Sequence, residues 1–595
     1  MKDLAVLNQY FIKYKWHFLF GILFVSLSNF FRVLQPQMIR EALDLVINNV
    51  GLYDSFRGSS LQNEYFGMLG QQLLFFGGLV LLLALMMGLF MYFMRQTIIV
   101  MSRLIEYDLR KKIFAHYQEL DLGFYKRNNT GDLMARITED VNKVRMYLGP
   151  AVLYGINLVS LFVLVISSMV SVNLELTLWC LAPLPFLSVS IYYVSNLINK
   201  KSTVIQVQLA NLNSIAQEVY SGIRVVKSYV QGSAMTRFFS IESDDYKEKA
   251  LDLAKVNALF FPLMLLLIGA STALTIYVGG IKVVSGAISP GNIAEFVIYV
   301  NMLTWPVTAI GWIASIIQQA AASQHRINEF MDTPTAIQNQ AKYDGPIEGN
   351  IEFDAVNFVY PDTGTKAINN FNLKLKAGDK LAIIGRTGSG KTTVADLLVR
   401  MYDVSSGTIR IDGHPIEEHD LYNLRKRIGY VPQDVFLFSD TISHNIAFGK
   451  REAEQAEVED FARYASVYED IKELSDGFQT FVGERGVTLS GGQKQRVSIA
   501  RALIKKPDIV ILDDCLSAVD TNTEKQILEY FNEQLQDKTC IIITHRIYSL
   551  LEFDKIIVLD DGHIVEEGTH EELIQNGGYY SDLYEKQRME DVIVE

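Results

Sequence analysis

The residues best suited to chemistry form one contiguous run, Gly-Arg-Thr-Gly-Ser-Gly-Lys-Thr-Thr at 385–393. This run fits the pattern G-x-x-x-x-G-K-[ST], follows the apolar segment 381–384 and precedes a helical pattern over 394–400. Strand, loop and helix in this order form the context that a phosphate-binding loop requires. A chance glycine-rich turn is the alternative, and the correct flanking elements argue against it. We therefore expect this chain to bind a nucleoside triphosphate.

Each residue type in the loop has a physical task in holding phosphates. The glycines let backbone N–H groups turn inward around the phosphates, and the N-terminus of the following helix adds a partial positive charge. The Lys391 ammonium is placed to contact the terminal phosphates, and the Thr392 hydroxyl is placed to ligate Mg²⁺. The predicted nucleotide-binding residues of the loop are Gly385, Arg386, Thr387, Gly388, Ser389, Gly390, Lys391, Thr392 and Thr393.

Two adjacent carboxylates and a histidine follow strand patterns further along the chain. Asp513 and Asp514 come directly after the apolar run 509–512, and α/β folds place their ligands at the carboxyl ends of such strands. Asp513 is placed to hold Mg²⁺, and Asp514 is placed to polarise the attacking water. His545 directly follows the strand pattern 540–544, and its neutral imidazole can hydrogen-bond a γ-phosphate or the water there. A satisfied structural histidine is the alternative.

Three further motifs have an ordinary structural alternative when each is taken alone. Tyr360 ends a strand pattern about 25 residues before the loop and is placed to stack on a base. Gln433 follows the strand pattern 428–432, where its amide can contact Mg²⁺ or the attacking water. Leu489–Gln493 opens a helical pattern and forms an anion site there, with Ser490, Gly491, Gly492 and Gln493 as binding residues. The alternatives are a strand aromatic, a surface glutamine and a plain helix N-cap.

Two contrasting sequence patterns must position these residues. From about residue 351, strand and helix patterns alternate as in a soluble α/β domain. Before about residue 320, six apolar segments are long enough to cross a bilayer, which takes about 20 residues. These segments are residues 16–38, 72–94, 147–171, 176–198, 257–281 and 290–317. We expect a transmembrane domain at 1–330, a linker at 331–350 and a nucleotide-binding domain at 351–590.

The charges set the orientation of the membrane domain and limit the classes of partner. Lysine and arginine gather in the long connections 95–146 and 199–256, whereas the connections on the other side carry few. By the positive-inside rule, both long connections and both termini are cytoplasmic. The net charge of −13 gives no electrostatic support for nucleic-acid binding. The three cysteines have no metal-like spacing, and no disulfide framework is expected.

Ionisable residues inside apolar segments are candidates for function. Arg32 in the first segment and Glu295 in the sixth both lie toward the outer leaflet. Our hypothesis is that both face the interior of the bundle and pair, lining or gating an outward pathway. The alternative is that each side chain extends to the interface. The stripe Leu4, Leu7 and Phe11 is also open: it fits either a short helix on the membrane surface or an extension of the first span.

In order and spacing, these motifs resemble the ATP-binding cassette, and with the six spans the whole chain resembles an ABC exporter half-transporter. The resemblance implies an α-helical six-span transmembrane domain plus an α/β P-loop ATP-binding cassette domain in the cytoplasmic membrane, with ATP and Mg²⁺ as cofactors. It assigns Thr392, Gln433 and Asp513 to the metal, and Asp514, His545 and Gln433 to catalysis.

The resemblance also implies a second half-transporter chain. Each nucleotide is then held between the phosphate loop of one chain and the signature motif, Leu489–Gln493, of the other. Coupling helices are expected near Asp121–Tyr125 and Val219–Ser228. Thr480–Gly486 resembles the exporter loop that senses the membrane domain, and Ser517–Asp520 resembles the family motif after the second carboxylate. The other expected partners are membrane lipid and a small amphipathic substrate.

One position departs from the family pattern. The residue after the Mg²⁺-side aspartate is usually glutamate, and here it is Asp514. Aspartate is one methylene shorter, which places its carboxylate roughly 1.5 Å further back. A misplacement of about 1 Å can cost on the order of 100-fold in rate. The chain therefore resembles the subunit of bacterial heterodimeric multidrug exporters that carries the slow ATP site. A homodimer in which Asp514 still works is the alternative.

Three functions fit these observations. The first is ATP-driven export of amphipathic, drug-like compounds. A lipid flippase or a peptide exporter shares the same architecture. A nonpumping membrane sensor or ATP-gated channel is a different class, and ATP-dependent accumulation of substrate in inverted vesicles separates it from an exporter. The six spans exclude a soluble ABC protein of DNA repair or translation.

Overall fold

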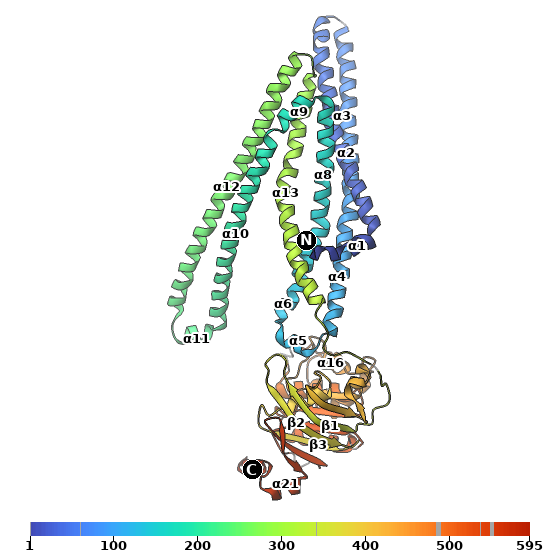
Figure 1. Ribbon diagram of the computed structural model, residues 1–595, viewed down its shortest axis with the longest axis vertical. Helices are drawn as coiled ribbons and strands as arrows, with labels where there is room; N and C mark the ends of the chain where they lie inside the picture. The colour runs from blue at the N-terminus through green and yellow to red at the C-terminus, as the bar shows by residue number, and fades with distance from the viewer. Residues whose placement is uncertain are drawn as a thin grey trace. The chain divides into compact units, whose positions relative to one another are not determined.

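The computed structural model describes residues 2–59, 61–340, 342–483, 489–519, 521–535, 537–547 and 552–594 (Figure 1). The chain divides into two compact units. The helical unit comprises residues 1–116 and 131–333, and the α/β unit comprises residues 117–130 and 334–595. A short segment of the N-terminal half therefore folds with the α/β unit.

Within the described residues, six helical stretches are long and apolar enough to cross a membrane. They run over Lys15–Ser55, Leu61–Glu119, Thr130–Val172, Leu174–Ser221, Gly232–Val284 and Pro290–Met331. This confirms the six-span fold class. The stretches are longer than the six predicted segments, because the charged connections beyond the apolar core continue the same helices. The 53 residues of α12 (Gly232–Val284), for example, rise about 80 Å, far more than the roughly 30 Å of hydrocarbon.

Three short π-helical turns lie inside the second and third of these stretches, and one short helix connects the fourth stretch to the fifth. Along the chain, the helical region has two parts. The first part contains α2 (Lys15–Ser55), α3 (Leu61–Met94), η2 (Arg95–Ile99), α4 (Val100–Glu119), α6 (Thr130–Ala135), η3 (Arg136–Asp140), α7 (Val141–Met146) and η4 (Tyr147–Ala151). The second part contains α8 (Val152–Val172), α9 (Leu174–Leu181), α10 (Pro183–Ser221), α11 (Ile223–Ser228), α12 and α13 (Pro290–Met331).

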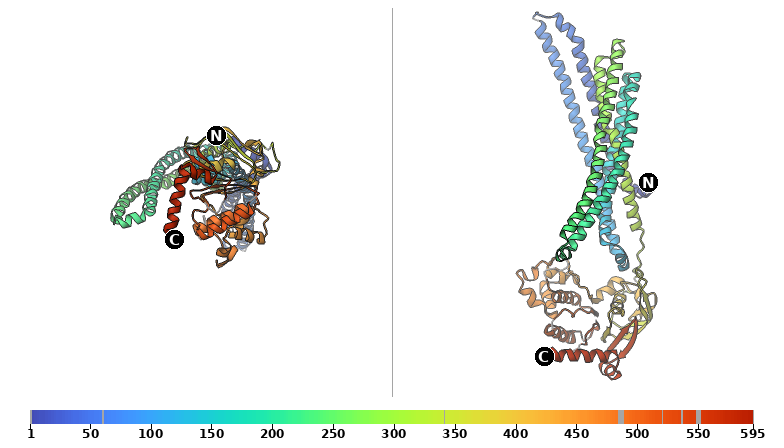
Figure 2. Two further views of the ribbon diagram at one scale, coloured as in Figure 1. Left: turned by 90° about the horizontal axis from the view of Figure 1, so that it is seen from below. Right: turned by 90° about the vertical axis from the view of Figure 1, so that its left-hand side faces the viewer.

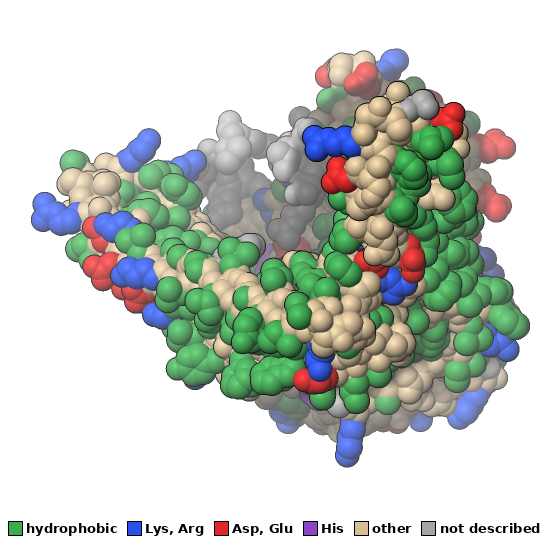
Figure 3. Space-filling model, turned by 90° about the horizontal axis from the view of Figure 1, so that it is seen from above, with side chains coloured by type: hydrophobic (Ala, Val, Ile, Leu, Met, Phe, Trp, Pro, Cys, Tyr) green, Lys and Arg blue, Asp and Glu red, His purple; other side chains and the backbone are tan. Residues whose placement is uncertain are grey.

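The core of the helical unit lies where α2, α8, α9 and α13 meet. Val33, Leu161, Val165, Phe296 and Tyr299 are among its buried side chains. Outward-facing positions are also apolar: Leu74, Leu81 and Leu85 of α3 are largely exposed, and hydrophobic side chains form large areas along the helices in Figure 3. An exposed apolar surface of this extent is expected for helices that lie in lipid.

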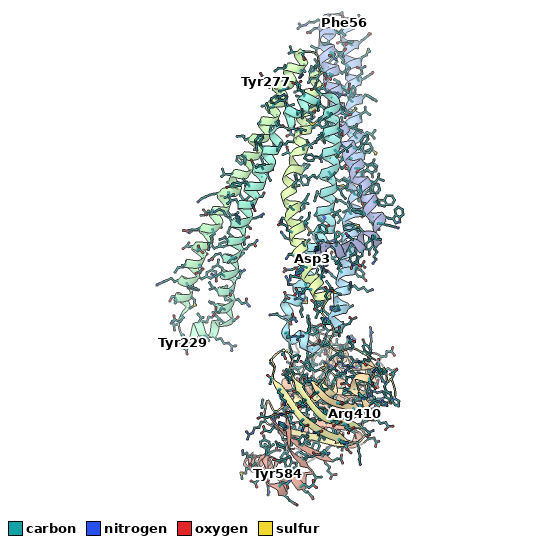
Figure 4. The ribbon with its side chains drawn as sticks, viewed as in Figure 1. Asp3, Phe56, Tyr229, Tyr277, Arg410 and Tyr584 are labelled. Carbon is teal, nitrogen blue, oxygen red and sulfur yellow. The ribbon has the colours of Figure 1, made fainter. Side chains whose placement is uncertain are left out.

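The hairpin of α10 and α12 leans away from α8 and α13 toward its tip (Figures 1 and 2). The tip is α11, which has no buried residue in the part of the chain that the structure describes. Tyr229, just after α11, is 73% exposed and is labelled at the tip in Figure 4. Packing within this chain therefore leaves α11 uncovered.

The N-terminal stripe forms a separate helical element. η1 (Asp3–Leu7) and α1 (Asn8–Lys13) are divided from α2 by the non-helical backbone of Tyr14. Leu4 and Leu7 are buried against the helical unit, and Lys13 donates to the Asp108 carboxylate at 2.6 Å. Of the two open interpretations, the structure therefore favours a short helix distinct from the first span.

The described residues of the α/β unit form two sheets. The antiparallel sheet has the order β2-β1-β4-β5, with β1 (Ile351–Val359), β2 (Lys366–Leu375), β4 (Ser406–Ile411) and β5 (His414–Pro415). The second sheet has the order β10-β9-β3-β8-β7-β6, and β9-β3-β8-β7-β6 are parallel. Its strands are β3 (Lys380–Gly385), β6 (Ile428–Val431), β7 (Ile509–Asp513), β8 (Thr539–Ile543), β9 (Lys555–Asp560) and β10 (His563–Gly568).

Short helices and turns cover the second sheet and connect its strands. They are α14 (Lys391–Leu398), η5 (Ile416–Glu418), α15 (Leu421–Arg427), α16 (Ile442–Ala447), α17 (Gln455–Tyr464), α18 (Tyr468–Lys472), η6 (Gly477–Gln479), α19 (Gly491–Leu503), α20 (Thr521–Gln534), α21 (His570–Asn576) and α22 (Tyr579–Val594). The segment 117–130 adds α5 (Leu122–Arg127). In parallel register, Ile383 pairs with Ile543 and Asp513 also pairs with Ile543, so β3, β7 and β8 end at one edge. That edge brings the predicted motifs together.

Candidate functional site

A cavity of about 290 Å³ lies at the carboxyl ends of β3, β7 and β8. It gathers side chains from five separate stretches of sequence, all inside the α/β unit. Its lining residues are Tyr360, Thr365, Lys366, Ala367, Thr387, Gly388, Gly390, Lys391, Thr392, Thr393, Gln433, Asp513, Asp514, Ile543 and His545. The structure thus brings together Tyr360, six residues of the phosphate loop, Gln433, both aspartates and His545.

The phosphate loop joins β3 to α14 through a left-handed glycine. Gly390 caps α14 with a φ of 101°, and a Cβ atom there would come within 2.4 Å of the Ala367 carbonyl oxygen. Both the backbone conformation and the lack of space therefore require glycine at this position. The Lys391 ammonium donates to the carbonyl oxygens of Gly385 and Arg386, at 2.8 Å each. Burial lowers the pKa of Lys391. The chain thus holds a desolvated cation beneath the loop.

The remaining loop residues do not line the cavity. Ser389 is buried, and its hydroxyl has no hydrogen-bond partner among the described residues. Arg386 points elsewhere, with its guanidinium 5.6 Å from the ring centre of Tyr579 in α22. No sequence signal connected Arg386 with the C-terminal helix. Thr365, Lys366 and Ala367, at the start of β2, were also not predicted, because they belong to no recognisable motif.

Asp513 ends β7 and is only 1% exposed. Burial raises the pKa of its carboxyl group, which a hydrogen bond from Thr392 opposes. Its Oδ2 atom is buried and has no hydrogen-bond partner among the described residues. A buried carboxylate oxygen beside a threonine hydroxyl suits Mg²⁺, which prefers oxygen ligands. The donor set of Asp513, Thr392 and the Gln433 amide therefore fits this ion.

Asp514 follows β7 in a left-handed conformation, with a φ of 46°. Its backbone N–H donates to the Ile543 carbonyl at 2.8 Å, which fixes the turn. Its Oδ2 accepts a hydrogen bond from the Gln433 Nε2 at 3.3 Å. His545 follows β8 and lines the same cavity. The carboxylate, the amide and the imidazole thus surround the space in which a water could be oriented.

Tyr360 follows β1, and its ring lines the cavity. Its hydroxyl group lies 2.9 Å from the Thr393 Oγ1. Burial raises the pKa of the Tyr360 phenol, so the ring stays neutral at physiological pH. A neutral aromatic ring at the mouth of a phosphate-binding cavity suits stacking on a base.

The signature motif lies at the N-terminus of α19. The Ser490 side chain accepts from the Gln493 N–H, and the Gln493 side chain accepts from the Ser490 N–H, which completes a capping box. Ser490, Gly491, Gly492 and Gln493 are not among the lining residues of the cavity. Two predicted motifs fall partly outside the described residues: Glu484, Arg485 and Gly486 of one loop, and Asp520 of the other.

Asp396 in α14 provides a test of the electrostatics beside the cavity. Burial raises its pKa from the ordinary 3.8 to about 6, against the attraction of the Lys126 ammonium. The native state therefore binds more protons than the unfolded state between these values, and the free energy of unfolding falls as pH rises from about 4 to about 6. Asp396→Asn is expected to stabilise the protein at pH 7 by up to about 3 kcal/mol.

The measurement for Asp396 is the thermal unfolding midpoint of the purified protein across this pH range. The difference between Asp396→Asn and the wild type should fall to a small fraction of its pH 7 value near pH 4, where the wild-type carboxyl group is protonated in the native state and close to half protonated in the unfolded state. An equal difference at pH 4 and pH 7 would attribute the effect to packing and contradict the prediction.

A second polar cluster lies in the helical unit, at the contact of α2 and α13. Glu295 is fully buried and accepts hydrogen bonds from the Arg40 Nη1 at 3.2 Å, the Asn292 Nδ2 at 3.1 Å and the Tyr299 hydroxyl at 3.0 Å. The predicted pairing of Glu295 with Arg32 is therefore wrong. Arg32 is partly buried and has no ion pair or hydrogen bond among the described residues. The packing of α13 against α2 instead places Glu295 beside Arg40, about two helical turns after Arg32.

Comparisons with known proteins bear on both units. Residues 18–307 match the family model of the ABC transporter transmembrane region, and residues 368–517 match that of the ABC transporter. The chain is 36% identical over 519 residues to a probable multidrug resistance ABC transporter ATP-binding/permease protein, YheI, of Bacillus subtilis, covering 87% of this chain and 89% of the relative. It is 36% identical over 520 residues to the multidrug resistance-like ATP-binding protein MdlA of Escherichia coli, covering 87% and 88%.

A third relative and a solved structure extend the comparison. The chain is 34% identical over 521 residues to the ATP-dependent lipid A-core flippase of Syntrophus aciditrophicus, covering 87% of this chain and 86% of the relative. It also resembles the structure of a bacterial Atm1-family ABC exporter with ATP bound, with a TM-score of 0.76 and 25% identity over 98% of this chain and 99% of that chain.

Proposed function

The chain belongs to the ABC transporter family, and from this premise we propose that it is one half of a two-chain exporter of amphipathic, drug-like compounds. Members of this family couple ATP hydrolysis to transport, so the chain is an ATPase and a multi-pass membrane protein. We assign residues 1–330 to the transmembrane domain, 331–350 to the linker and 351–590 to the nucleotide-binding domain. The nucleotide-binding domain and both termini then lie on the cytoplasmic side of the cytoplasmic membrane.

The observation that carries this proposal is the composition of the cavity at the ends of β3, β7 and β8. It gathers groups that suit a triphosphate, a Mg²⁺ ion and an attacking water. The signature residues Ser490–Gln493 are absent from its lining, so a nucleotide bound there leaves them available to the nucleotide of a second chain. The tip helix α11 has no buried residue among those described, so its surface is free to contact a second chain as a coupling helix would. This also supports the proposal of a two-chain exporter.

Each cavity residue that the sequence predicted receives a role in this proposal. Tyr360 stacks on the base, the phosphate loop holds the phosphates, and the Lys391 ammonium offsets their charge. Thr392, Asp513 and Gln433 would hold Mg²⁺, which neutralises charge on the phosphate oxygens when it is bound. Asp514 accepts a proton from the attacking water, and the His545 imidazole donates a hydrogen bond to the γ-phosphate.

We further propose that the site on this chain is the slow one of a heterodimer. The Asp514 side chain is one methylene shorter than the usual glutamate, and its Oδ2 accepts a hydrogen bond from the Gln433 side chain. The intact signature of this chain would complete the fast site of a partner that carries glutamate. The alternative is a homodimer in which Asp514 remains the working base.

A second candidate substrate class is lipid. It is favoured by the 34% identity to a protein described as an ATP-dependent lipid A-core flippase. A lipid and a drug-like amphiphile share an apolar tail and a polar head, so the architecture suits both. Uptake of a fluorescent amphiphile by inverted vesicles, compared with movement of a fluorescent phospholipid between leaflets, separates these two classes.

The decisive experiment measures ATP turnover of the chain alone and with a candidate partner half-transporter. We expect the lone chain to be nearly inactive and the pair to be active. In the pair, Asp514→Asn should change turnover less than twofold, because the partner's site performs most of the hydrolysis. Asp514→Glu should leave the pair at least as active as the wild type.

Activity of the chain alone would instead indicate a homodimer. If the lone chain forms an active dimer that Asp514→Asn abolishes, Asp514 is the working base and the protein is a homodimeric exporter. If neither the chain nor the pair accumulates a fluorescent amphiphile in inverted vesicles on addition of ATP, the exporter proposal itself fails.

A further inference from the structure

The segment 117–130 is built into the α/β unit by specific contacts. The Asp121 carboxylate caps α5 by accepting from the Phe124 N–H at 3.0 Å, and Phe124 is buried. Leu122 packs against the hydrophobic core beneath β1 and β2. A Cβ atom on Gly123 would lie 3.5 Å from the Tyr402 ring and 3.6 Å from Pro361. The α5 helix therefore lies against the turn that follows β1.

This contact places one cation over the aromatic ring of the nucleotide cavity. The Lys126 Nζ lies 4.7 Å from the ring centre of Tyr360 and 5.4 Å from that of Tyr402. The two rings are perpendicular, with their centres 5.5 Å apart. Both distances to Lys126 fall within the roughly 6 Å range of a cation–π contact. The ammonium therefore contacts two tyrosines at once.

Tyr360 separates Lys126 from the cavity. Tyr360 is one of the residues that line the cavity, and Lys126 is not. The Tyr360 ring is also held at its hydroxyl group, 2.9 Å from Thr393 in the phosphate loop. The ring centres of Phe358 and Tyr402 lie 4.9 and 5.5 Å from that of Tyr360, and Lys126 lies over its π-system. Of these contacts of the Tyr360 side chain, the one with Lys126 is supplied by the segment 117–130.

We propose that Lys126 is a positioning residue for nucleobase recognition: it holds the Tyr360 ring against α5, so that stacking of a base in the cavity and docking of α5 strengthen each other. The inference rests on the proposed role of the cavity as an ATP site. Base stacking and α5 docking affect each other equally, by thermodynamic linkage. A base that orders the Tyr360 ring also orders the surface that the Lys126 ammonium contacts. The segment that leads into the membrane helices thereby senses the base, independently of the phosphates.

The test compares two probes on the full-length protein, alone or with its partner: Mg–ATP, which has a base, and Mg–tripolyphosphate, which has none. Lys126→Met is expected to weaken ATP binding about three- to tenfold, the range of a partly desolvated cation–π contact, and to leave tripolyphosphate binding unchanged. Lys126→Arg keeps the cation and should restore ATP binding. Arg127→Met, which removes the same charge from the adjacent position, is the matched control and should bind both probes as the wild type does.

A double-mutant cycle with Tyr360→Ala isolates the contact. Lys126→Met should cause no further loss of ATP affinity in the Tyr360→Ala background. The proposal is overturned if Lys126→Met weakens both probes equally, if it weakens neither, or if its effect persists without the Tyr360 ring. Failure of the proposed function has a separate signature: the wild-type protein would then not bind Mg–ATP, which overturns both.

Discussion

Lys391→Met is expected to weaken ATP binding at this chain's own site by on the order of 100-fold. The buried ammonium donates to two carbonyl oxygens of the phosphate loop, at 2.8 Å each. Its removal leaves those oxygens without a donor and takes away the cation that offsets the triphosphate. Hydrogen bonds that involve charged groups contribute roughly 1.5–3 kcal/mol each, and about 1.4 kcal/mol corresponds to a tenfold change in affinity.

The measurement is the dissociation constant for Mg–ATP of the purified full-length protein, with the thermal unfolding midpoint as a check on folding. Lys374→Met is the matched control, because Lys374 pairs with Glu352 on the exposed face of the other sheet. The control should bind ATP as the wild type does. Undiminished binding by Lys391→Met would place the triphosphate elsewhere and refute the assignment of the cavity.

The second large effect concerns stability of the helical unit. Glu295→Ala is expected to lower the free energy of unfolding by about 3 kcal/mol, the lower end of the range for breaking a buried ion pair. The carboxylate is fully buried and joins Arg40 of α2 to Asn292 and Tyr299 of α13. The lower end applies because the Arg40 side chain is 24% exposed and keeps part of its hydration.

Thermal unfolding of the detergent-solubilised protein measures this effect. Glu175→Ala provides the control, because Glu175 pairs with Lys282 at an exposed position and such pairs contribute about 1 kcal/mol or less. Glu295→Gln, which keeps the shape and can still accept hydrogen bonds, should lie between the wild type and Glu295→Ala. Equal midpoints for Glu175→Ala and Glu295→Ala would show that the buried cluster carries no special share of the stability.

Much of the α/β site was predictable because its signals are local. The phosphate loop is contiguous, and β3 and α14 beside it follow from the apolar run before it and the helical pattern after it. Asp513 and His545 were found because each ends a run of apolar residues, and parallel strands bring such ends to one edge. In these cases the neighbouring residues in sequence determine the position of the side chain.

Pairings between distant helices were not predictable in the same way. Arg32 and Arg40 lie eight residues apart on α2, which separates them by about 12 Å along the helix axis and by about 80° around it. The position of α13 along α2 and the rotation of α2 about its own axis together decide which arginine meets Glu295, and both follow from the packing of many side chains. The periodicity of a sequence indicates which face of a helix is buried, but it does not indicate how two packed helices are positioned against each other.

Contacts between segments far apart in sequence were missed for the same reason. Tyr402 belongs to no motif, yet its buried ring contacts Gly123 and Lys126 across almost 280 residues of sequence. Burial raises the pKa of Tyr402 to about 12. A coupling helix was expected near Asp121–Tyr125, and its residues lie at and within α5, but of the two rings that Lys126 contacts only Tyr360 belonged to a predicted motif.

The assignment of residues 117–130 to the α/β unit has a consequence for biosynthesis. The ribosome completes this segment before the 203 residues from Gly131 to Thr333, and those precede the rest of its unit. At about 5–20 residues per second, synthesis of these 203 residues separates the segment from the rest of its unit by roughly 10–40 s. A recombinant fragment that begins at Pro334 lacks this segment. The surface around Tyr402 that α5 covers in the full-length chain is then exposed to solvent.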